Sequence, residues 1–212
     1  LTATGVDLRD ARLPGARLVG ANLVNARLPN VDLTDAELLD VNLSGANLDG
    51  ADLSRSDLTG ADLSQSSLQA TALRQANLTQ ATLTDAHLNG ADLVRATLIE
   101  TTMDGVQMVG TRAFDLRLDA CPVDELPLGW RCVDQPATRL VALIGPEADL
   151  GARPVDEHPD GADLTGADLS GISLLNAVLP GVRAFDLEGC PQDLPAIAGQ
   201  DDLEQQVRWG CI

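Results

Sequence analysis

The chain has 212 residues, of which 44% are hydrophobic, a length and composition that suit one or two globular domains. Its 14 basic residues are all arginine, and its 32 acidic residues give a formal net charge of -18 at pH 7. Such a chain repels the phosphates of nucleic acids and anionic lipids, and no apolar run approaches the roughly 18 residues that span a bilayer. We therefore expect neither direct nucleic-acid binding nor membrane insertion.

A leucine recurs at every fifth residue from Leu8 to Leu98, and Met103 and Met108 extend the series to 21 consecutive units. The residue two places before each of these centres is small: 13 are Ala, 4 are Val, 2 are Ser and 2 are Thr. The residue between the two is usually polar, and many units end in Gly, Asp, Asn or Gln. Because the chain has so few aromatic residues, its core has to be built from Leu, Ala and Val.

A spacing of five fits neither a helix nor a straight strand. On a helix, successive leucines would step by about 140° and reach every face. In a strand they would alternate between the two faces, because five is odd. Within one unit, however, the small residue and the leucine share a face, so the chain has to turn after each leucine, where Gly, Asn and Asp favour turns. Short strands joined by repeated corners predict a solenoid with a leucine and alanine interior.

Units such as Ala46–Gly50, Ala51–Arg55 and Ala61–Gln65 resemble the tandem A(D/N)LxG-like units of the pentapeptide-repeat family. The resemblance covers residues 6–110 and returns at 162–182. It implies an all-β fold, the right-handed quadrilateral parallel β-helix, with about 20 residues in each coil. On that basis the first block makes about five coils and rises about 25 Å, at ~4.8 Å for each coil.

The implied coil predicts which polar side chains stack. The expected columns are Asn22, Asn42, Asp62, Thr82 and Thr102; Asp32, Asp52, Ala72 and Asp92; and Glu37, Asp57, Asn77 and Thr97. The acids among them form either a solvated wall that resists aggregation or an anionic recognition surface. The candidate acidic surface consists of Asp32, Glu37, Asp52, Asp57, Asp62 and Asp92.

A longer pattern occurs twice after the repeats. Arg-Ala-Phe-Asp-Leu, followed by Cys-Pro, Leu-Pro, Trp and Cys, occupies residues 112–132 and again 183–211. These two tails resemble those of exported members of the family. An uncapped solenoid exposes edge strands and an apolar end, so we expect the tails to cap it. The expected capping residues are the four aromatic ones: Phe114, Trp130, Phe185 and Trp209.

Each tail holds one pair of cysteines, which favours the disulfides Cys121–Cys132 and Cys190–Cys211 among the three possible pairings. Free thiols are one alternative; zinc is another, but neither pair has C-x-x-C spacing. Disulfides indicate an oxidising compartment, so we expect an extracellular or periplasmic protein, with the cytoplasm as the alternative. A chain that begins at Leu1 rather than Met suits a processed export precursor or a trimmed chain.

The pattern divides the chain into residues 1–138, the long repeat block with the first tail, and 139–212, a short block with the second tail. The short block has fewer than two coils, so we expect it to stack on the first, with residues 111–139 looping out. A capping-box-like sequence at Asp201–Glu204 predicts a short C-terminal helix. No cap-like segment precedes Val6, which suits a monomer or a weak end-to-end dimer.

The sequence contains no nucleophile-elbow, P-loop, zincin or dinucleotide-binding motif. Its two histidines, His87 and His158, are expected on the surface. Each repeat offers its carboxylate the same surroundings, whereas acid–base catalysis needs carboxylates in unlike surroundings. We therefore expect no catalytic residue, no metal and no cofactor. Calcium at the insertion 151–160 is the minor alternative. Asp156, Glu157, Asp160 and the nearby Asp163 could supply oxygen ligands, but their spacing matches neither an EF-hand loop nor a glycine-rich nonapeptide calcium repeat.

These observations predict a non-enzymatic, exported structural or protein-interaction scaffold with an unknown protein partner. The alternative is a DNA-mimicking acidic binder of a type II topoisomerase, as in the gyrase-protecting members of the family. Residues 1–110 carry 14 acidic residues and 7 arginines. A net charge of about -7 over about 25 Å is more dilute than duplex DNA, which has about one charge per 1.7 Å.

Overall fold

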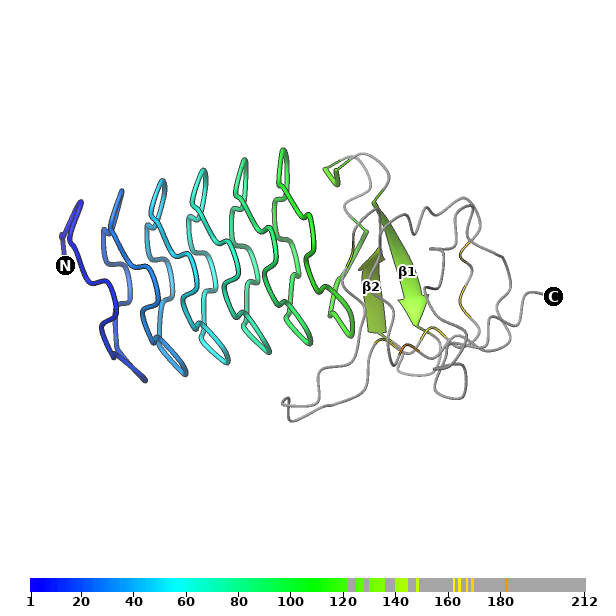
Figure 1. The fold of residues 1–212 in the computed structure, drawn as a ribbon, viewed down its shortest axis with the longest axis horizontal. Coiled ribbons are helices and arrows are strands. Elements are labelled where there is room, and N and C mark those ends of the chain that lie inside the picture. The colour runs from blue at the N-terminus through cyan, green and yellow to red at the C-terminus, as the bar shows by residue number, and fades with distance from the viewer. Residues whose placement is uncertain are drawn as a thin grey trace, which may run out of the picture.

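The computed structural model describes residues 1–121, 125–127, 130–135 and 140–144, and the single positions 148, 162, 164, 167, 169 and 182. Residues 1–117 wind into a stack of similar coils that runs from the N-terminus to a two-stranded hairpin (Figure 1). The polar residue before each centre pairs in parallel with the residue 20 places on, from Thr2 with Asn22 to Thr97 with Arg117. The 20-residue coil is therefore confirmed.

The stack is longer at both ends than the expected 6–110. Leu1–Gly5 already forms a unit, with Ala3 at its centre, and a further unit has Ala113 at its centre. These two units lie outside the Leu and Met series because alanine fills the inward position in both.

Each unit from Leu1 to Gly110 ends in the same corner. The N–H of Ala51 donates to the carbonyl of Leu48 at 2.9 Å, and the equivalent bond recurs along the stack. From Gly5 to Asp115, every fifth residue has φ between 52° and 70°, and 14 of these residues are not glycine. A positive φ at the third residue of such a turn is the geometry of type II. The turn brings each leucine back to the interior, which explains how an odd repeat keeps one face inward.

Except at the ends of the stack, neighbouring coils are joined by three backbone hydrogen bonds in each unit. In one unit, Leu48 N–H donates to Ser67 O at 2.7 Å and Gly50 N–H to Gln69 O at 2.8 Å. Ser67 N–H returns a bond to Ala46 O at 2.9 Å. Each coil therefore exchanges donors and acceptors with the coils on both sides, and an end coil lacks these partners on its outer side.

The interior holds the predicted leucines and small residues, and Leu48, Leu53 and Leu58 are fully buried. Two kinds of buried hydroxyl replace alanine without leaving a polar atom unpaired. Ser56 donates to the corner carbonyl of Leu53 at 2.7 Å, whereas Thr71 reaches back to that of Leu48 at 2.8 Å. The leucines of the first coil are only partly buried, since no described coil lies beyond them.

A hairpin packs on the last coil (Figure 1). Strand β1 (Arg131–Gln135) pairs antiparallel with β2 (Leu140–Ile144). β2 in turn pairs with the end of the stack, where Leu116 and Val141 exchange hydrogen bonds of 2.8 and 3.1 Å. Residues 112 and 117 still pair with the coil before them, so the segment expected to loop out first continues the stack.

In the second repeat block, Ala162, Leu164, Ala167 and Leu169 are buried, and Ala167 N–H donates to Leu164 O at 3.0 Å, as at the corners of the first block. Stacking of 139–212 on the first block stays a prediction. The helix expected near Asp201 lies outside the described residues. Within the part of the chain that the structure describes, no helix is long and apolar enough to cross a membrane.

Candidate interaction surface and end cap

Where an aspartate precedes a centre leucine, its carboxylate has a structural task that sequence reasoning missed. In the Asp52 unit, a carboxylate oxygen accepts the N–H of Ser54, two residues on, at 2.9 Å. Asp32, Asp57, Asp62 and Asp92 make the same contact with the residue two places on. The bond holds the chain at the start of the corner, as in an Asx turn.

Asparagine accepts the same hydrogen bond, because holding the corner requires an acceptor oxygen and no charge. Asn42 and Asn47 accept the N–H groups of Ser44 and Asp49, both at 3.0 Å. At Asp32, hydrogen bonds from the hydroxyl and then the N–H of Thr34 lower the pKa of the carboxyl. The interchange of Asp and Asn at this position was the available signal for the role.

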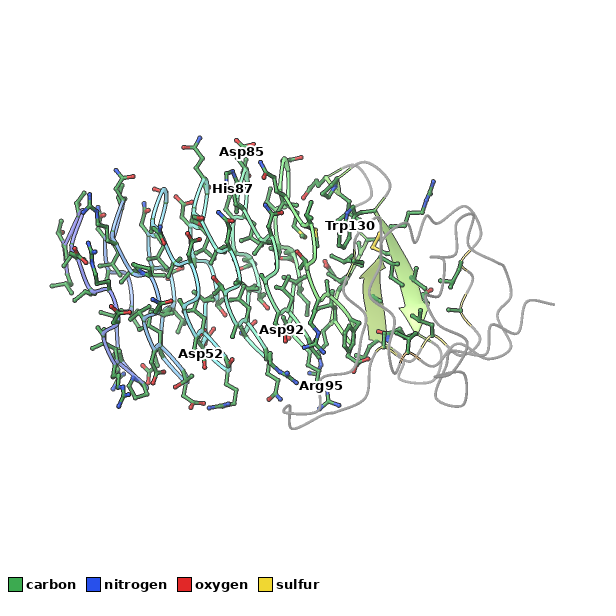
Figure 2. All side chains as sticks on the ribbon, viewed as in Figure 1. Asp52, Asp85, His87, Asp92, Arg95 and Trp130 are labelled. Atoms are coloured by element: carbon green, nitrogen blue, oxygen red, sulfur yellow. A yellow bond between two sulfur atoms is a disulfide. The ribbon has the colours of Figure 1, made fainter. Side chains whose placement is uncertain are left out.

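The predicted columns are confirmed, and arginines end two of them. Arg12 and Arg112 lie at the two ends of the column that contains Asp32, Asp52, Ala72 and Asp92. Arg17 and Arg117 end the column that contains Glu37, Asp57, Asn77 and Thr97. Within the second column, Arg17 forms an ion pair with Glu37 at 2.9 Å. In Figure 2, Asp52 and Asp92 lie along one side of the rod, and Asp85 and His87 near its opposite edge.

Other charges pair across corners. Arg55 holds Asp35 through two hydrogen bonds of 2.8 Å, which lower the pKa of that carboxyl. Within the first coil, hydrogen bonding by Arg9 lowers the pKa of Asp7 to about 2. These pairs are exposed, and each contributes little to stability.

Asp92 differs from the other candidate acids because a buried arginine neutralises it. Arg112, only 1% exposed, places Nη1 2.5 Å from the Asp92 carboxylate and stacks over the ring of Phe114 at 5.4 Å. Arg74 approaches the same carboxylate at 3.6 Å. Asp92 therefore belongs to the closure of the stack, since its charge is largely compensated.

The remaining candidate acids fall in one part of the rod. Residues 31–70, the acidic band, hold eight acidic residues and one arginine, a net charge of -7. Residues 1–30 hold four arginines and two acids, and residues 71–110 four acids and two arginines. The negative charge is thus concentrated in about two coils. The band contains Asp32, Asp35, Glu37, Asp40, Asp49, Asp52, Asp57 and Asp62.

At the C-terminal end of the stack, side chains replace the carbonyls of a missing coil. Elsewhere an amide such as Asp85 N–H donates to the carbonyl 19 residues on. At the end, Glu100 N–H donates instead to the Asp119 carboxylate at 3.2 Å, which lowers the pKa of Asp119. Met103 N–H donates to Glu125 Oε2 at 2.6 Å, and Asp115 N–H to the buried Gln135 Oε1 at 2.8 Å.

The predicted disulfide Cys121–Cys132 is present and joins the segment after the last coil to β1. The loop it closes contains Glu125, so the bond keeps that acceptor at the end of the stack. Phe114 and Trp130 are buried in the same region. Cys190, Cys211, Phe185 and Trp209 lie outside the described residues.

No group of three metal-ligating side chains occurs within the described segments. The insertion 151–160 lies outside them. His87 is exposed on a polar column between Ser67 and Gln107, as expected. The polar side chains described above hold the solenoid's own backbone or one another.

Comparison with known proteins agrees with this architecture. A family model described as pentapeptide repeats matches residues 4–38, 36–80, 76–112 and 160–184. No curated protein sequence matches the chain. Among solved structures, QnrB1, described as a plasmid-mediated fluoroquinolone resistance protein, is 15% identical over 99% of this chain and 91% of its own, with a TM-score of 0.54.

Two cyanobacterial pentapeptide-repeat proteins are also similar. Alr5209 from Nostoc PCC 7120 is 32% identical over 53% of this chain and 84% of its own, with a TM-score of 0.39. Rfr23 from Cyanothece 51142 is 24% identical over 56% of this chain and 91% of its own, with a TM-score of 0.42. The family model covers more than half of the sequence, and the chain belongs to the pentapeptide-repeat family, whose members fold as right-handed quadrilateral β-helices.

Proposed function

We propose that this protein is a non-enzymatic scaffold that binds another protein through the outer faces of its solenoid, chiefly through the acidic band. Pentapeptide-repeat proteins are generally structural or binding proteins. A binding role suits a rod whose interior is filled with leucine, because only the outer side chains are then free to recognise anything.

The observation that carries the proposal is the uneven charge along the rod. A net charge of -7 in residues 31–70 lies between a slightly positive N-terminal segment and a weakly negative one. The corner contacts need only an acceptor oxygen, so the charge of Asp52, Asp57 and Asp62 is not required for the fold. Charge concentrated in this way attracts and orients a basic partner.

A pair of matched variants tests this role. Asp52→Asn/Asp57→Asn/Asp62→Asn removes three band charges and keeps each corner acceptor. Asp10→Asn/Asp85→Asn/Asp104→Asn removes three exposed charges elsewhere and serves as the control. We expect partners chemically cross-linked to the native protein, and then purified, to bind the control normally and the band variant at least tenfold more weakly. Equal binding of the two variants would contradict the proposal.

The topoisomerase alternative rests on a separate observation. At ~4.8 Å per coil, the acidic band spans about 10 Å, and duplex DNA of that length carries about six charges. The band itself is thus as densely charged as DNA, although the solenoid as a whole is not. A gyrase supercoiling assay separates the two functions: the scaffold proposal expects full supercoiling at micromolar protein, and the alternative expects inhibition.

We also propose an oxidising compartment. The Cys121–Cys132 bond supports it, since cytosolic thiols are generally kept reduced. Non-reducing mass mapping of protein from its natural source tests the compartment. Both tails are expected to be disulfide-linked, and alkylation of Cys121 and Cys132 without prior reduction would contradict it.

A further inference from the structure

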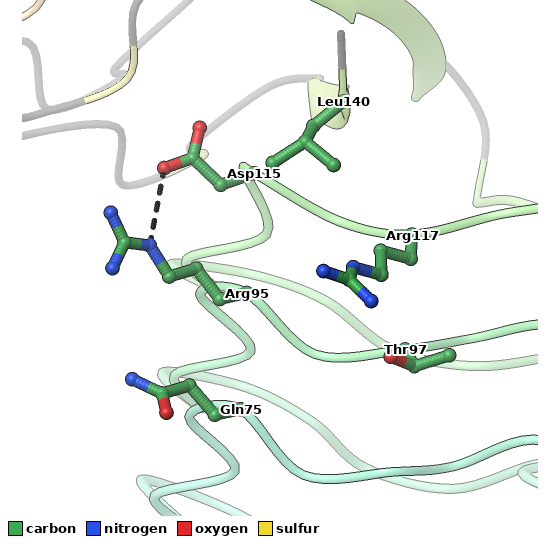
Figure 3. Close-up of a pocket in the computed structure, with 6 residues that line it drawn as sticks. All are labelled: Gln75, Arg95, Thr97, Asp115, Arg117 and Leu140. Atoms are coloured by element: carbon green, nitrogen blue, oxygen red, sulfur yellow. Dashed lines mark ion pairs between the residues drawn. The ribbon is translucent and has the colours of Figure 1, made fainter. Parts of the chain in front are cut away.

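A pocket lies where the hairpin meets the last coils. It encloses about 540 Å³ and is lined by Gln75, Arg95, Thr97, Asp115, Arg117 and Leu140 (Figure 3). Gln75, Arg95 and Asp115 come from one corner column, Thr97 and Arg117 from the adjacent face, and Leu140 from the first position of β2. The pocket is thus built by the junction of solenoid and cap.

The cations of the pocket are unequally compensated. Arg95 points to Asp115, with Nε 3.8 Å from the carboxylate. The Asp115 carboxylate also accepts a hydrogen bond from the Gln135 amide at 3.1 Å. Arg117, in contrast, forms no ion pair with any carboxylate among the residues that the structure describes. Its side chain extends along the face toward the Arg95 corner (Figure 3).

Two backbone hydrogen bonds hold Arg117, so the point from which its side chain extends is fixed. Arg117 N–H donates to Ala96 O at 3.1 Å, and its carbonyl accepts Leu98 N–H at 2.8 Å. Thr97, its partner in the parallel bridge, places a hydroxyl on the same face. Gln75 adds an amide, and Leu140 adds an apolar wall.

This combination suits one class of ligand. A guanidinium offers parallel donors that match the two oxygens of a carboxylate. The net charge of -18 disfavours a highly charged anion at long range, whereas a single carboxylate beside an apolar group meets Arg117 and Leu140 together. We propose that this pocket binds a carboxylate carried by a peptide segment, either an acidic side chain or a chain terminus. The natural source of that peptide rests on the proposed scaffold function, but the binding itself does not.

Titration calorimetry on the full chain at low ionic strength tests the site. The probes are acetyl-Leu-Glu-Leu-amide, its Gln counterpart, acetyl-Leu-Gln-Leu with a free C-terminus, and inorganic phosphate. We expect either or both carboxylate peptides to bind in the millimolar range or tighter, and the uncharged Gln amide to bind at least tenfold more weakly. Comparison of the side-chain and terminal carboxylates distinguishes the two sources.

Arg117→Gln should weaken binding of the carboxylate peptide at least tenfold. Arg27→Gln, a change at the equivalent place of a unit on another face and in the second coil, should leave it unchanged. Three results would overturn the assignment. The first is equal binding of the Glu and Gln amides with no binding of the free terminus, the second is equal binding by wild type and Arg117→Gln, and the third is binding of phosphate alone. Neither variant alters the acidic band, so failure here is separable from failure of the scaffold proposal.

Discussion

At the scale of single residues, an Asp that precedes a centre leucine has two separate effects. Its oxygen accepts the hydrogen bond at the corner, and its charge lies in a column where a neighbouring coil can place a second acid, as Asp32 does beside Asp52. Asp52 lies between Asp32 and Ala72 in its column. Like charges opposite one another on neighbouring strands are unfavourable, so the hydrogen bond and the charge act in opposite directions on stability.

Substitutions at Asp52 separate these two effects. Asp52→Ala removes the acceptor for Ser54 N–H and should lower the free energy of unfolding by about 1 kcal/mol. Asp52→Asn keeps the acceptor and removes repulsion from Asp32, so stability should be unchanged or slightly higher. Urea unfolding measures both. An alanine variant as stable as the asparagine variant would show that the corner bond contributes nothing.

The fifth position of each unit provides a second prediction. Ala70 has φ of 54°, a region that costs a residue with a Cβ about 1–2 kcal/mol, whereas Ala72, two residues on, has no positive φ. Ala70→Gly relieves this cost but adds freedom to the unfolded chain, for a net gain of about 0.5 kcal/mol. Ala72→Gly should instead destabilise by about 0.5–1 kcal/mol. Thermal unfolding of the two glycine variants tests whether each gains or loses stability. A loss of stability in both would contradict the corner geometry.

At the scale of elements, the coils need no regular strands, because single bridges and corners repeat often enough to hold them. The C-terminal end is the exception. There the hairpin supplies one antiparallel edge, and Asp119, Glu125 and Gln135 supply isolated acceptors where a further coil would have supplied carbonyls. The cap thus closes the stack by imitating the hydrogen bonds of the next coil, in addition to covering its apolar end.

Removing one of these acceptors should act locally. Glu125→Ala leaves Met103 N–H without its acceptor, and we expect a loss of about 1–2 kcal/mol and faster hydrogen exchange at that amide. Glu125→Gln keeps an oxygen and should retain most of the protection. Exchange at Leu48 N–H, within the stack, is the internal control. Equal protection of Met103 in wild type and Glu125→Ala would show that Glu125 is not the acceptor.

Acid should weaken the hydrogen bonds that four carboxylates accept, three within the coils and one at the cap. The pKa values of Asp7, Asp32, Asp35 and Asp119 are lowered in the folded protein, to about 2 at Asp7. Their contribution is therefore complete above the unfolded value near 4, and is lost as the pH falls through the folded values. High salt screens the general repulsion between the negative charges of the rod, so that the hydrogen-bonded carboxylates dominate the pH dependence. In 0.5 M NaCl we expect stability to be level from pH 7 to 5 and to fall between about pH 4 and 2; a steady rise to pH 2 would contradict this.

At the scale of the molecule, the fold follows from the sequence because each unit repeats the same local solution. The period, the inward leucines, the corner residues and the stacking of Asp32 on Asp52 could all be predicted. The Cys121–Cys132 pair was predictable because the two tails repeat the same order of residues, with one pair of cysteines in each. The repeat pattern did not predict the ion pair of Arg112 with Asp92, the hydrogen bond from Met103 N–H to Glu125, or the pocket at Arg117. These contacts depend on the path of a tail that has no period.

The acidic surface was predictable in composition but only partly in role. The columns gave the place of each acid, yet they did not distinguish Asp92, which a buried arginine neutralises, from Asp52, which faces solvent beside another acid. Arg112 is buried against Phe114, a residue of the tail. The distinction therefore required the structure of the cap.

Leucine fills the interior of the solenoid and leaves recognition to the outer side chains, and two adjacent residues of one unit test this arrangement most directly. Leu48 is fully buried, whereas Asn47 faces outward and accepts the N–H of Asp49. The measurement is the free energy of unfolding of Leu48→Ala and Asn47→Ala in urea. We expect a loss of about 3–5 kcal/mol for Leu48→Ala and no more than about 1.5 kcal/mol for Asn47→Ala. Equal losses, or a larger loss at Asn47, would contradict a leucine-filled solenoid.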